Sequence, residues 1–437
     1  MTKVATIVPV LLLMAIVTGS SRGAESIPVD VNTPATLSEY LGYAALNNPG
    51  LKAAFEAWQG AVEQVPQAEA LPDPRFTYGY FVEEVETRVG PQRQRAGIMQ
   101  VFPWFGTIEA RSDAAAAEAR AAARRFETAR LQLFYQVKDA FYEYLYLHRA
   151  IQIARENVEL IQHFEEVARA KYIASAARHP DIIRAQVQLA ILEDRLRELQ
   201  ELRVPIVARL NAVLNRPADT PLPWPSSPEM PSVDVERGEV FDLLKRRNPQ
   251  LEAKEFDLGA AMSRTELAKR RFYPEIGVGV DWIDTDEALM AGVPDSGKDP
   301  VILMFSMNLP IWRKSYGAAE QQARAAARRV RHERDDLENT LIARASRVLY
   351  DFEDSGRKLS LYSDVLVPKA EELVGASESA YMAGTIDFLS LIDAQQTFLQ
   401  YQLQRERAWA TQNQRLAELE MLVGADLAAA NPTQHEN

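Results

Sequence analysis

The chain contains no cysteine among its 437 residues. It can therefore form neither a disulfide framework nor a thiolate metal site, and it lacks the lipidated N-terminal cysteine that anchors bacterial lipoproteins. We expect its stability to come from packing and assembly.

An excess of basic residues is also missing. The sequence holds 49 Lys and Arg residues against 61 Asp and Glu residues, which gives a formal net charge of −12. Nucleic-acid binding needs a clustered Lys and Arg surface that displaces counterions from the phosphates. The composition therefore argues against nucleic acid as a partner, while 47% apolar residues suffice for a sizeable core.

Long hydrophobic runs are absent as well. The one pronounced run, residues 4–17, follows Lys3 and precedes small residues up to Ala24. This pattern is typical of a secretory signal peptide over residues 1–24. The run is shorter than the ~20 apolar residues of a membrane-spanning helix, which disfavours the alternative of an uncleaved inner-membrane anchor.

Groups of residues suited to catalysis or metal binding do not assemble in the sequence. The stretch "GVPDSGKD" at Gly292 differs from a phosphate-binding loop because Asp299 stands where Ser or Thr should hold magnesium. Met304 and Met307 lie on a predicted strand, where this spacing points them to opposite faces. The histidines are scattered without ligand spacing: His148, His163, His179, His332 and His435. We predict no enzyme activity, no catalytic residue, no metal site and no cofactor.

What the sequence does contain is a duplication. "NPGLKA" at Asn48 returns as "NPQLEA" at Asn248, 200 residues later, and Tyr172 pairs with Tyr381 at a distance of 209. The offset grows in one direction along the chain, as insertions in a true duplication require.

Proline recurs between the two copies, which excludes a continuous helix or a central strand there and predicts a linker. We therefore divide the chain into a signal peptide, two repeats with a linker between them, and a flexible C-terminal tail. The signal peptide is 1–24, the first repeat 25–215, the linker 216–234, the second repeat 235–424 and the tail 425–437.

Each repeat follows one order of predicted elements. A helical stretch, residues 37–69 or 235–270, leads into a β-hairpin of two alternating segments at about 75–103 or 274–310. Phe76, Tyr78, Tyr80 and Val82 share one face of the first strand, as Ile276, Val278, Val280 and Trp282 do in the second hairpin.

The predicted strands have about ten residues, the length of a tilted transmembrane strand, although a soluble sheet with one face on a core is the alternative. Four strands cannot close a barrel and would leave sticky edges. Copies from several subunits could close it.

A long helical hairpin follows each β-hairpin, at about 106–214 and 315–424. Residues 107–173 contain no Pro or Gly, which permits about 100 Å of continuous helix. Heptad positions recur along both copies and predict coiled-coil packing and an elongated, tubular object. The positions are Val137, Tyr144, Ile151 and Val158, with Ala140, Leu147, Ala154 and Ile161 three residues on, and Phe352, Leu359, Leu366 and Leu373 in the second copy.

At these residues the layout resembles the TolC-type outer-membrane efflux protein family. The resemblance rests on the paired "NP" motifs, on "LPDP" at Leu71 and "PWFG" at Pro103, and on the turn "YMAGTIDFLSLIDAQ" at Tyr381. "LPDP" and "PWFG" are closer to the branch of heavy-metal and cation efflux channels. The resemblance implies an α+β membrane protein: a homotrimer whose four strands per protomer share one transmembrane β-barrel, above a hollow cylinder of long helices.

The resemblance also implies a function. The protein would be the passive outer-membrane exit duct of a tripartite efflux system in a Gram-negative bacterium, exporting metal cations or drugs. Its partners would be a periplasmic adaptor (membrane fusion) protein, an inner-membrane pump of the resistance-nodulation-division type, and outer-membrane lipid. The alternative is a soluble periplasmic coiled-coil scaffold without channel activity. A third class, the adaptor itself, is disfavoured by the duplication and by the absence of cysteine.

By position, the turns that reverse the long helices would contact the adaptor. The residues are Ser175, Arg178, Asp181, Gly384, Thr385, Ile386 and Asp387. Ser175 stands where the family usually has glycine, so the first turn could have a different backbone conformation from the second. Some members of the family carry a basic residue at the position of Ile386, where its ion pair helps to hold the tip of the helices closed. Here Arg178, Asp181 and Asp387 are the candidates for another such ion pair.

Acidic residues gather on the two β-hairpins. Those predicted for the pore or its mouth are Glu83, Glu84, Asp281, Asp284 and Asp286. Tripled around a pore they could bias conduction toward cations, although acidic loops also keep a barrel mouth hydrated.

Overall fold

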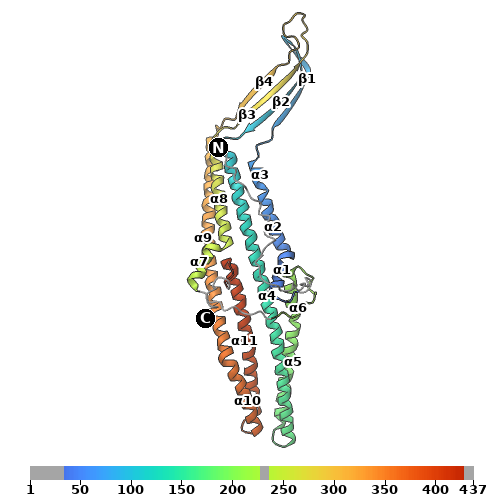
Figure 1. Ribbon diagram of the computed structural model, residues 1–437, viewed down its shortest axis with the longest axis vertical. Coiled ribbons are helices and arrows are strands. Elements are labelled where there is room, and N and C mark those ends of the chain that lie inside the picture. The colour runs from blue at the N-terminus through green and yellow to red at the C-terminus, as the bar shows by residue number, and fades with distance from the viewer. Residues whose placement is uncertain (1–33, 227–235, 428–437) are drawn as a thin grey trace, which may run out of the picture.

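A computed structural model describes residues 34–226 and 236–427. The molecule is elongated, with a β-sheet at one end and bundled helices below it (Figure 1). The signal peptide predicted for residues 1–24 lies outside the described residues, as do parts of the predicted linker and C-terminal tail.

The elements follow the same order twice. The first half contains α1 (Leu37–Asn47), α2 (Pro49–Val62), α3 (Gln64–Glu69), β1 (Arg75–Thr87), β2 (Gly90–Phe102), α4 (Thr107–Ile173), α5 (His179–Glu201) and α6 (Arg203–Leu214). The second half contains α7 (Arg237–Arg247), α8 (Pro249–Arg270), β3 (Ile276–Thr285), β4 (Val301–Met307), α9 (Arg313–Leu361), the π-helical turn η1 (Tyr362–Leu366), α10 (Val367–Ala383) and α11 (Phe388–Val423).

The helical stretch before each β-hairpin is divided into separate helices. The chain breaks at Asn48 and at Asn248, whose side chains cap the next helix by accepting bonds from Leu51 N and Leu251 N respectively. A proline follows each asparagine, and the residue before a proline is pushed out of helical geometry. Each asparagine amide also donates to the C-terminal end of another helix, to the carbonyl of Val213 or of Leu422, so the two breaks fix equivalent helix junctions.

The four strands form one antiparallel sheet in the order β1-β2-β3-β4. Phe76 lies opposite Ile98, Ile98 opposite Val280, and Val280 opposite Leu303. Strands β1 and β2 have 13 residues each, longer than predicted, whereas β4 has 7. The β2·β3 pairing joins the two halves of the chain in one sheet.

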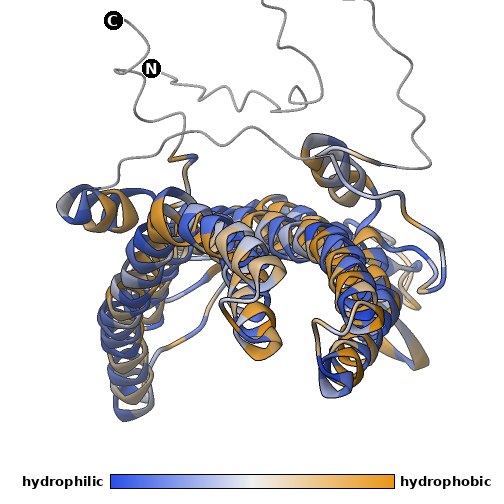
Figure 2. Cartoon of the chain, turned by 90° about the horizontal axis from the view of Figure 1, so that it is seen from below, coloured by the Kyte–Doolittle hydropathy of each residue, from blue (hydrophilic) through white to orange (hydrophobic). Residues whose placement is uncertain are grey.

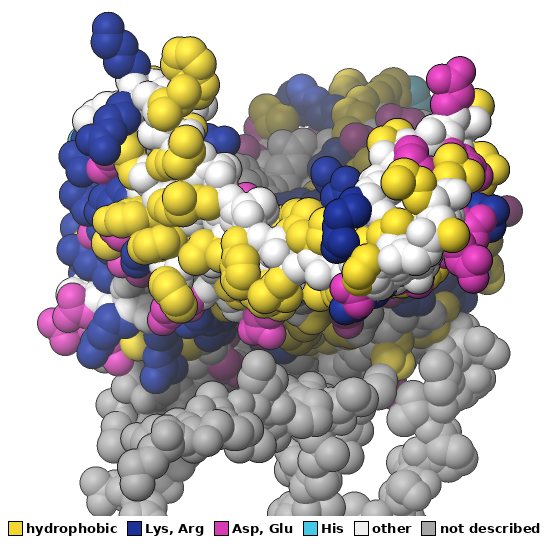
Figure 3. Space-filling view, turned by 90° about the horizontal axis from the view of Figure 1, so that it is seen from above, with side chains coloured by type: hydrophobic (Ala, Val, Ile, Leu, Met, Phe, Trp, Pro, Cys, Tyr) yellow, Lys and Arg dark blue, Asp and Glu magenta, His cyan; other side chains and the backbone are white. Residues whose placement is uncertain are grey.

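The two faces of the sheet differ in polarity. One face carries exposed apolar side chains on all four strands, as the alternation in the sequence predicted: Phe76, Tyr78, Tyr80, Ile98, Val280, Trp282, Val301, Leu303 and Phe305. The other face, called the polar face below, carries glycines and the Arg95 and Asp281 side chains together with a few apolar ones such as Met99, Ile302 and Met304. Figure 3 looks down on this end, where hydrophobic side chains gather along one side. Strands β1 and β4 each have one edge without a strand partner among the described residues.

The helices form one curved layer (Figure 2). Near the sheet, α4 contacts α2 and α8, and α8 contacts α9, so the order across the layer is α2, α4, α8, α9. Farther from the sheet, α11 lies between α4 and the α9/α10 helix, and α5 packs on the other side of α4. The longest helix, α4, therefore runs through both levels.

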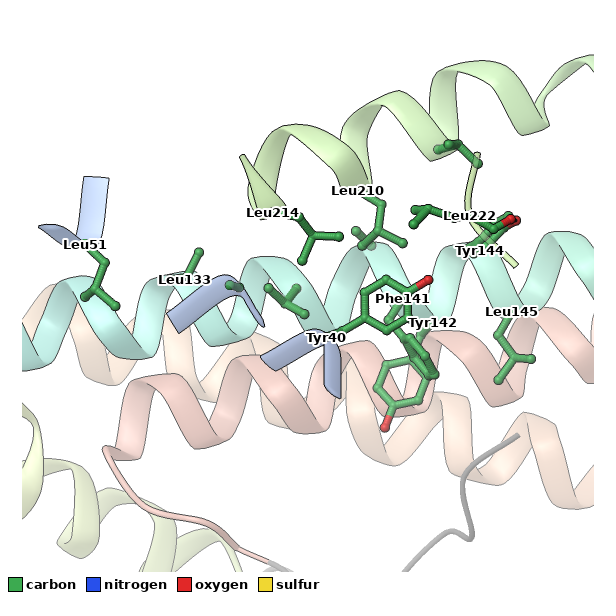
Figure 4. Packing of buried hydrophobic residues seen from close by; sticks show 14 residues of the cluster. Tyr40, Leu51, Leu133, Phe141, Tyr142, Tyr144, Leu145, Leu210, Leu214 and Leu222 are labelled. Carbon is green, nitrogen blue, oxygen red and sulfur yellow. The ribbon is translucent and has the colours of Figure 1, made fainter. Parts of the chain in front are cut away.

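The largest buried cluster lies where α1, α4 and α6 meet (Figure 4). Tyr40 and Phe141 pack edge to face with ring centroids 5.5 Å apart. The Tyr144 hydroxyl donates to the Leu222 carbonyl at 3.0 Å, and Trp224 stacks on Tyr144 at 4.9 Å. The described part of the proline-rich linker is thus fixed against the helices.

The heptad pattern is confirmed in α4, where all eight predicted positions are buried. In the second copy it is wrong beyond Leu359. The π-turn η1 inserts one residue, so Val367 and Val374 occupy the buried stripe where Leu366 and Leu373 were predicted. Pro368 explains the break, because proline lacks an amide donor and its ring crowds the carbonyl four residues earlier.

Single cysteines introduced into this cysteine-free chain can test the register. Val374 is 7% exposed and Leu373 is 48% exposed. We expect a hydrophilic maleimide to label Leu373→Cys at least about tenfold faster than Val374→Cys in the detergent-solubilised protein. A buried thiol reacts only when the helix packing opens locally, so its labelling is slower. Faster labelling at position 374 would mean that the heptads continue through η1 unbroken.

Candidate functional site: the concave wall and the helical turns

The helices near the sheet enclose two large grooves. One groove of about 890 Å³ lies over α8 and is lined by α4, α8 and α9; the second, of about 630 Å³, lies over α4 and is lined by α2, α4 and α8. Three neighbouring helices of a curved layer share one groove only on the concave side. Glu118, Asp257 and Arg264 line both grooves, so the two form one continuous concave wall.

Charges on the concave wall are paired with one another. Arg264 pairs with Glu118, and Arg125 donates to both oxygens of Asp257 at 2.6 and 2.7 Å. Lys254 lies 2.9 Å from Glu333, and hydrogen bonds from Lys254 and Arg329 lower the pKa of the Glu333 carboxyl. Alanines fill much of the remaining surface, including Ala57, Ala122, Ala260, Ala261 and Ala323. Below Arg111, Arg270 and Arg271 at its upper end, the wall is lined by small residues and paired charges, which suits a passage better than a tight binding site.

The polar face of the sheet continues this wall upward. Its principal charged pair joins β2 and β3, where the Arg95 Nε donates to Asp281 Oδ2 at 2.6 Å. The Asp281 side chain is only 3% exposed, whereas that of Arg95 is 47% exposed. Gly97 leaves room for the carboxylate, because a Cβ at that position would collide with it. Within one protomer Arg95 therefore covers the Asp281 carboxylate, and a role of Asp281 in a pore stays a prediction.

The remaining acidic residues predicted for the pore are placed differently. Asp284 accepts from Gln94 at 2.9 Å and lies on the apolar face, in register with Tyr80. Arg93 pairs with Asp286 and lies 3.5 Å from Glu84, while Glu83 is exposed. Arginines thus compensate several of the carboxylates. The sequence did not reveal these pairs, because their partners lie on different strands or far apart in the chain.

The two turns at the far ends of the helical hairpins have the same backbone conformation. Ser175 has φ 57° and Gly384 has φ 79°, both left-handed. The next amide in each turn bonds back five residues, from Ala176 N to Lys171 O at 2.7 Å and from Thr385 N to Ala380 O at 3.0 Å. Both are therefore the same helix-terminating motif. The replacement of glycine by Ser175 does not change the backbone.

The charged residues of the turns cap the helices that follow. The Asp387 carboxylate accepts from Ser390 N at 2.9 Å, and the bonds from Ser390 lower the pKa of Asp387. Asp181 accepts from Arg178 N at 3.3 Å and lies 4.0 Å from Arg184. The Arg178 guanidinium has no ion pair in the described parts of the chain. Within one protomer these residues act as caps and do not pair as a lock.

Lys171 ties the two turns together, a role that the sequence did not reveal. Its ammonium donates to the Tyr381 carbonyl and, at 3.0 Å, to the Met382 carbonyl. It also lies 4.5 Å from the centroid of the Tyr381 ring, which packs on Phe388. Burial, with a smaller contribution from Asp181, raises the pKa of Tyr381. A lysine beside backbone carbonyls leaves no pattern in the sequence, and the contact joins residues 210 apart.

An apolar groove of about 260 Å³ opens beside the turns, between α5 and α11. Ile183, Val187 and Leu389 line it and are about half exposed. Ile191 extends the apolar row along α5.

Residues 34–226 and 236–427 contain neither a metal-ligand cluster nor a membrane-spanning helix. No group of three or more His, Asp or Glu residues could hold a metal ion there. No described helix combines the length and apolar character needed to cross a membrane.

The chain is similar to known proteins in both sequence and fold. The family model described as "Outer membrane efflux protein" matches residues 41–216 and 240–425. The cobalt-zinc-cadmium resistance protein CzcC of Cupriavidus metallidurans is 25% identical, with 87% of this chain and 88% of CzcC covered. The pyoverdine export outer membrane protein OpmQ of Pseudomonas putida is 24% identical over 76% of this chain and 70% of its own. The solved structure of CusC superposes with a TM-score of 0.76 at 15% identity, over 89% of this chain and 92% of CusC.

Substitutions at the left-handed positions of the two turns should change amide hydrogen exchange in opposite directions. Gly384→Ala forces an alanine into left-handed geometry at a cost of about 1 kcal/mol. Hydrogen exchange at the Thr385 amide should therefore rise about fivefold, and Ser175→Gly should slow exchange at Ala176. The control Gly375→Ala, in the interior of α10 with free space around it, should slow local exchange instead. Equal effects of Gly384→Ala and Gly375→Ala would contradict the left-handed assignment.

Proposed function

Because this chain belongs to the outer membrane efflux protein family, we propose that it is the passive exit duct of a tripartite efflux system. It is an outer-membrane channel protein and not an enzyme. Members of the family form homotrimers and work with adaptors and inner-membrane pumps. The finer statements that follow are proposals for this chain.

The observation that carries the proposal is the open sheet. Strands β1 and β4 leave backbone groups unpaired, and the outward face is apolar from edge to edge. In hydrocarbon every backbone amide and carbonyl needs a partner, so such a sheet is stable only as part of a closed barrel. Three copies would contribute twelve strands and place the apolar face in lipid.

The helical part supports a duct. Helix α4 has 67 residues and spans about 100 Å at 1.5 Å per residue, enough to carry a conduit far from the membrane. The concave wall beside it is lined by small residues and paired charges. A solute would meet no strong binding site there, so release would not be slow.

We propose that cargo selection lies with the pump and the adaptor. CzcC is named for resistance to cobalt, zinc and cadmium, and OpmQ for export of pyoverdine, so the relatives span different cargoes. Export of metal cations or of drugs by this chain, and a pump of the resistance-nodulation-division type, follow from the resemblance of its motifs. The described wall adds no metal-ligating group that would favour one cargo.

The proposed adaptor site is the pair of turns with the apolar groove beside them. The predicted contact residues from Ser175 to Asp181 and from Gly384 to Asp387 form the end of the molecule opposite to the sheet. A helical hairpin of a partner could bury Ile183, Val187 and Leu389 while polar residues of the turns set its orientation. We also propose the division into two repeats, residues 25–215 and 235–424, as the origin of the paired turns.

The deciding experiment concerns location and assembly. The mature protein would be extracted from fractionated envelopes, sized by light scattering corrected for bound detergent, and added to planar bilayers. A conducting trimer from the outer-membrane fraction is the expected result. A species that stays soluble without detergent would contradict the proposal and favour the coiled-coil scaffold.

Binding to the adaptor should depend on the apolar groove. Val187→Glu places a charge in the groove, and we expect the affinity for an adaptor of the same organism to fall at least about tenfold, since burying an unpaired carboxylate costs more than 1.4 kcal/mol. Biolayer interferometry with the purified trimer would measure it. Val204→Glu, at a 74% exposed position on α6, is the matched control and should leave the affinity unchanged. Equal losses in both variants would place the adaptor elsewhere.

The Lys171 contact should hold the turns together. Lys171→Met removes two hydrogen bonds to carbonyls of α10, so the tips should separate more readily and single-channel conductance should rise. Lys369→Met is the control, because Lys369 pairs only with Glu372 on its own helix. Unchanged conductance in Lys171→Met would mean that this contact does not restrict the opening.

A further inference from the structure

Arginines converge where the polar face of the sheet meets the helices. Arg75 begins β1 and lies on the same face as Arg95, which is paired in register with Gly79, four residues farther along β1. At the upper end of the larger groove lie Arg111, Arg270 and Arg271. We call these five residues the basal collar.

The collar differs from the concave wall below it in its pairing. Arg75 and Arg271 are exposed and have no ion pair in the part of the chain that the structure describes. The Nε atom of Arg270 is buried and makes no hydrogen bond. Its guanidinium lies against Gly106, where a Cβ would come within 3.2 Å of an Arg270 nitrogen. Arg111 donates to the carbonyls of Ala68 and Ala70 and has no ion pair within the described residues.

Few carboxylates line the upper end of the larger groove. Asp281 forms an ion pair with Arg95, and its side chain is almost fully buried. Glu275 lines the upper end of the groove beside Arg271. The five arginines of the collar therefore exceed Asp281 and Glu275 by three charges in each protomer. Glu69, Asp73 and Glu109 lie at the same level but do not line the groove. The chain as a whole has a net charge of −12.

An aromatic surface adjoins the arginines. Trp104 and Tyr273 stack with their centroids 5.2 Å apart and their planes 12° apart, and both line the groove. Guanidinium groups beside aromatic faces can hold an organic anion by its charge and its apolar body together.

We propose that the basal collar is a site that attracts anionic solutes, those bearing carboxylate or phosphate groups, and gives the base of the barrel a preference for anions. The proposal rests on the proposed trimeric channel, in which the collar is repeated three times around the lumen. Charge lining a narrow, low-dielectric passage raises the local concentration of oppositely charged ions. The structure thus favours anions at the base, opposite to the cation preference suggested by the acidic residues of the hairpins.

The test is the reversal potential of single channels in planar bilayers under a KCl gradient, with Arg75→Gln and Arg271→Gln measured singly and together. At about 0.1 M salt, where the screening length is about 10 Å, the anion-to-cation permeability ratio should fall at least about twofold in the double variant. At about 1 M salt, where the screening length is about 3 Å, the difference should vanish. Arg331→Gln is the control, because Arg331 is exposed on α9, has no ion pair within residues 34–226 and 236–427, and lines neither groove.

Each outcome decides a separate statement. A double variant that conducts with an unchanged ratio at low salt, or changes it no more than the control does, would overturn the collar. A wild-type protein that never conducts would overturn the proposed channel instead. If the double variant does not assemble, the single variants decide, and Arg75→Lys should keep the wild-type ratio because the charge remains.

Discussion

The unpaired edges of β1 and β4 are the constraint from which the rest of the architecture follows. A four-stranded sheet with an apolar outer face cannot stay in water, and in lipid it cannot leave its edge amides and carbonyls without partners. Closure by other copies satisfies both requirements at once. It also makes the concave helical layer below the sheet one sector of a tube, because α4 and α9 follow directly from strands that are already placed around the barrel.

The two halves carry the same elements but not the same mechanics. Helix α4 keeps an unbroken heptad stripe over 67 residues, whereas its counterpart is interrupted by η1 and resumes one residue out of register. A π-turn is a weaker stretch of helix than its surroundings. The α10 and α11 end of the molecule therefore has a built-in joint that the α4 and α5 end lacks, and Lys171 bridges between these unlike ends.

The sequence predicted what depends on local periodicity and missed what depends on contacts across the fold. Alternation at Phe76, Tyr78 and Tyr80 gave the outer face, and heptads gave the buried side of α4. The helix breaks at Asn48 and Asn248 were visible as "NP" motifs, yet their capping role needs the folded chain. The Arg95 and Asp281 pair joins strands from different repeats, so the sequence did not reveal that Arg95 covers this carboxylate.

Charge along the inner surface changes in a way that suits a passive conduit. Paired charges in the concave wall give neither an attraction that would retain a solute nor a repulsion that would exclude it, since each ion pair presents little net field at a distance. Among the arginines that line the two grooves, those without an ion pair in the described residues lie where the wall meets the barrel: Arg111, Arg270 and Arg271. A passage whose field is confined to one short zone can bias which solutes enter that zone without holding them along its whole length, because the field of exposed charges falls off within about 8 Å in physiological salt.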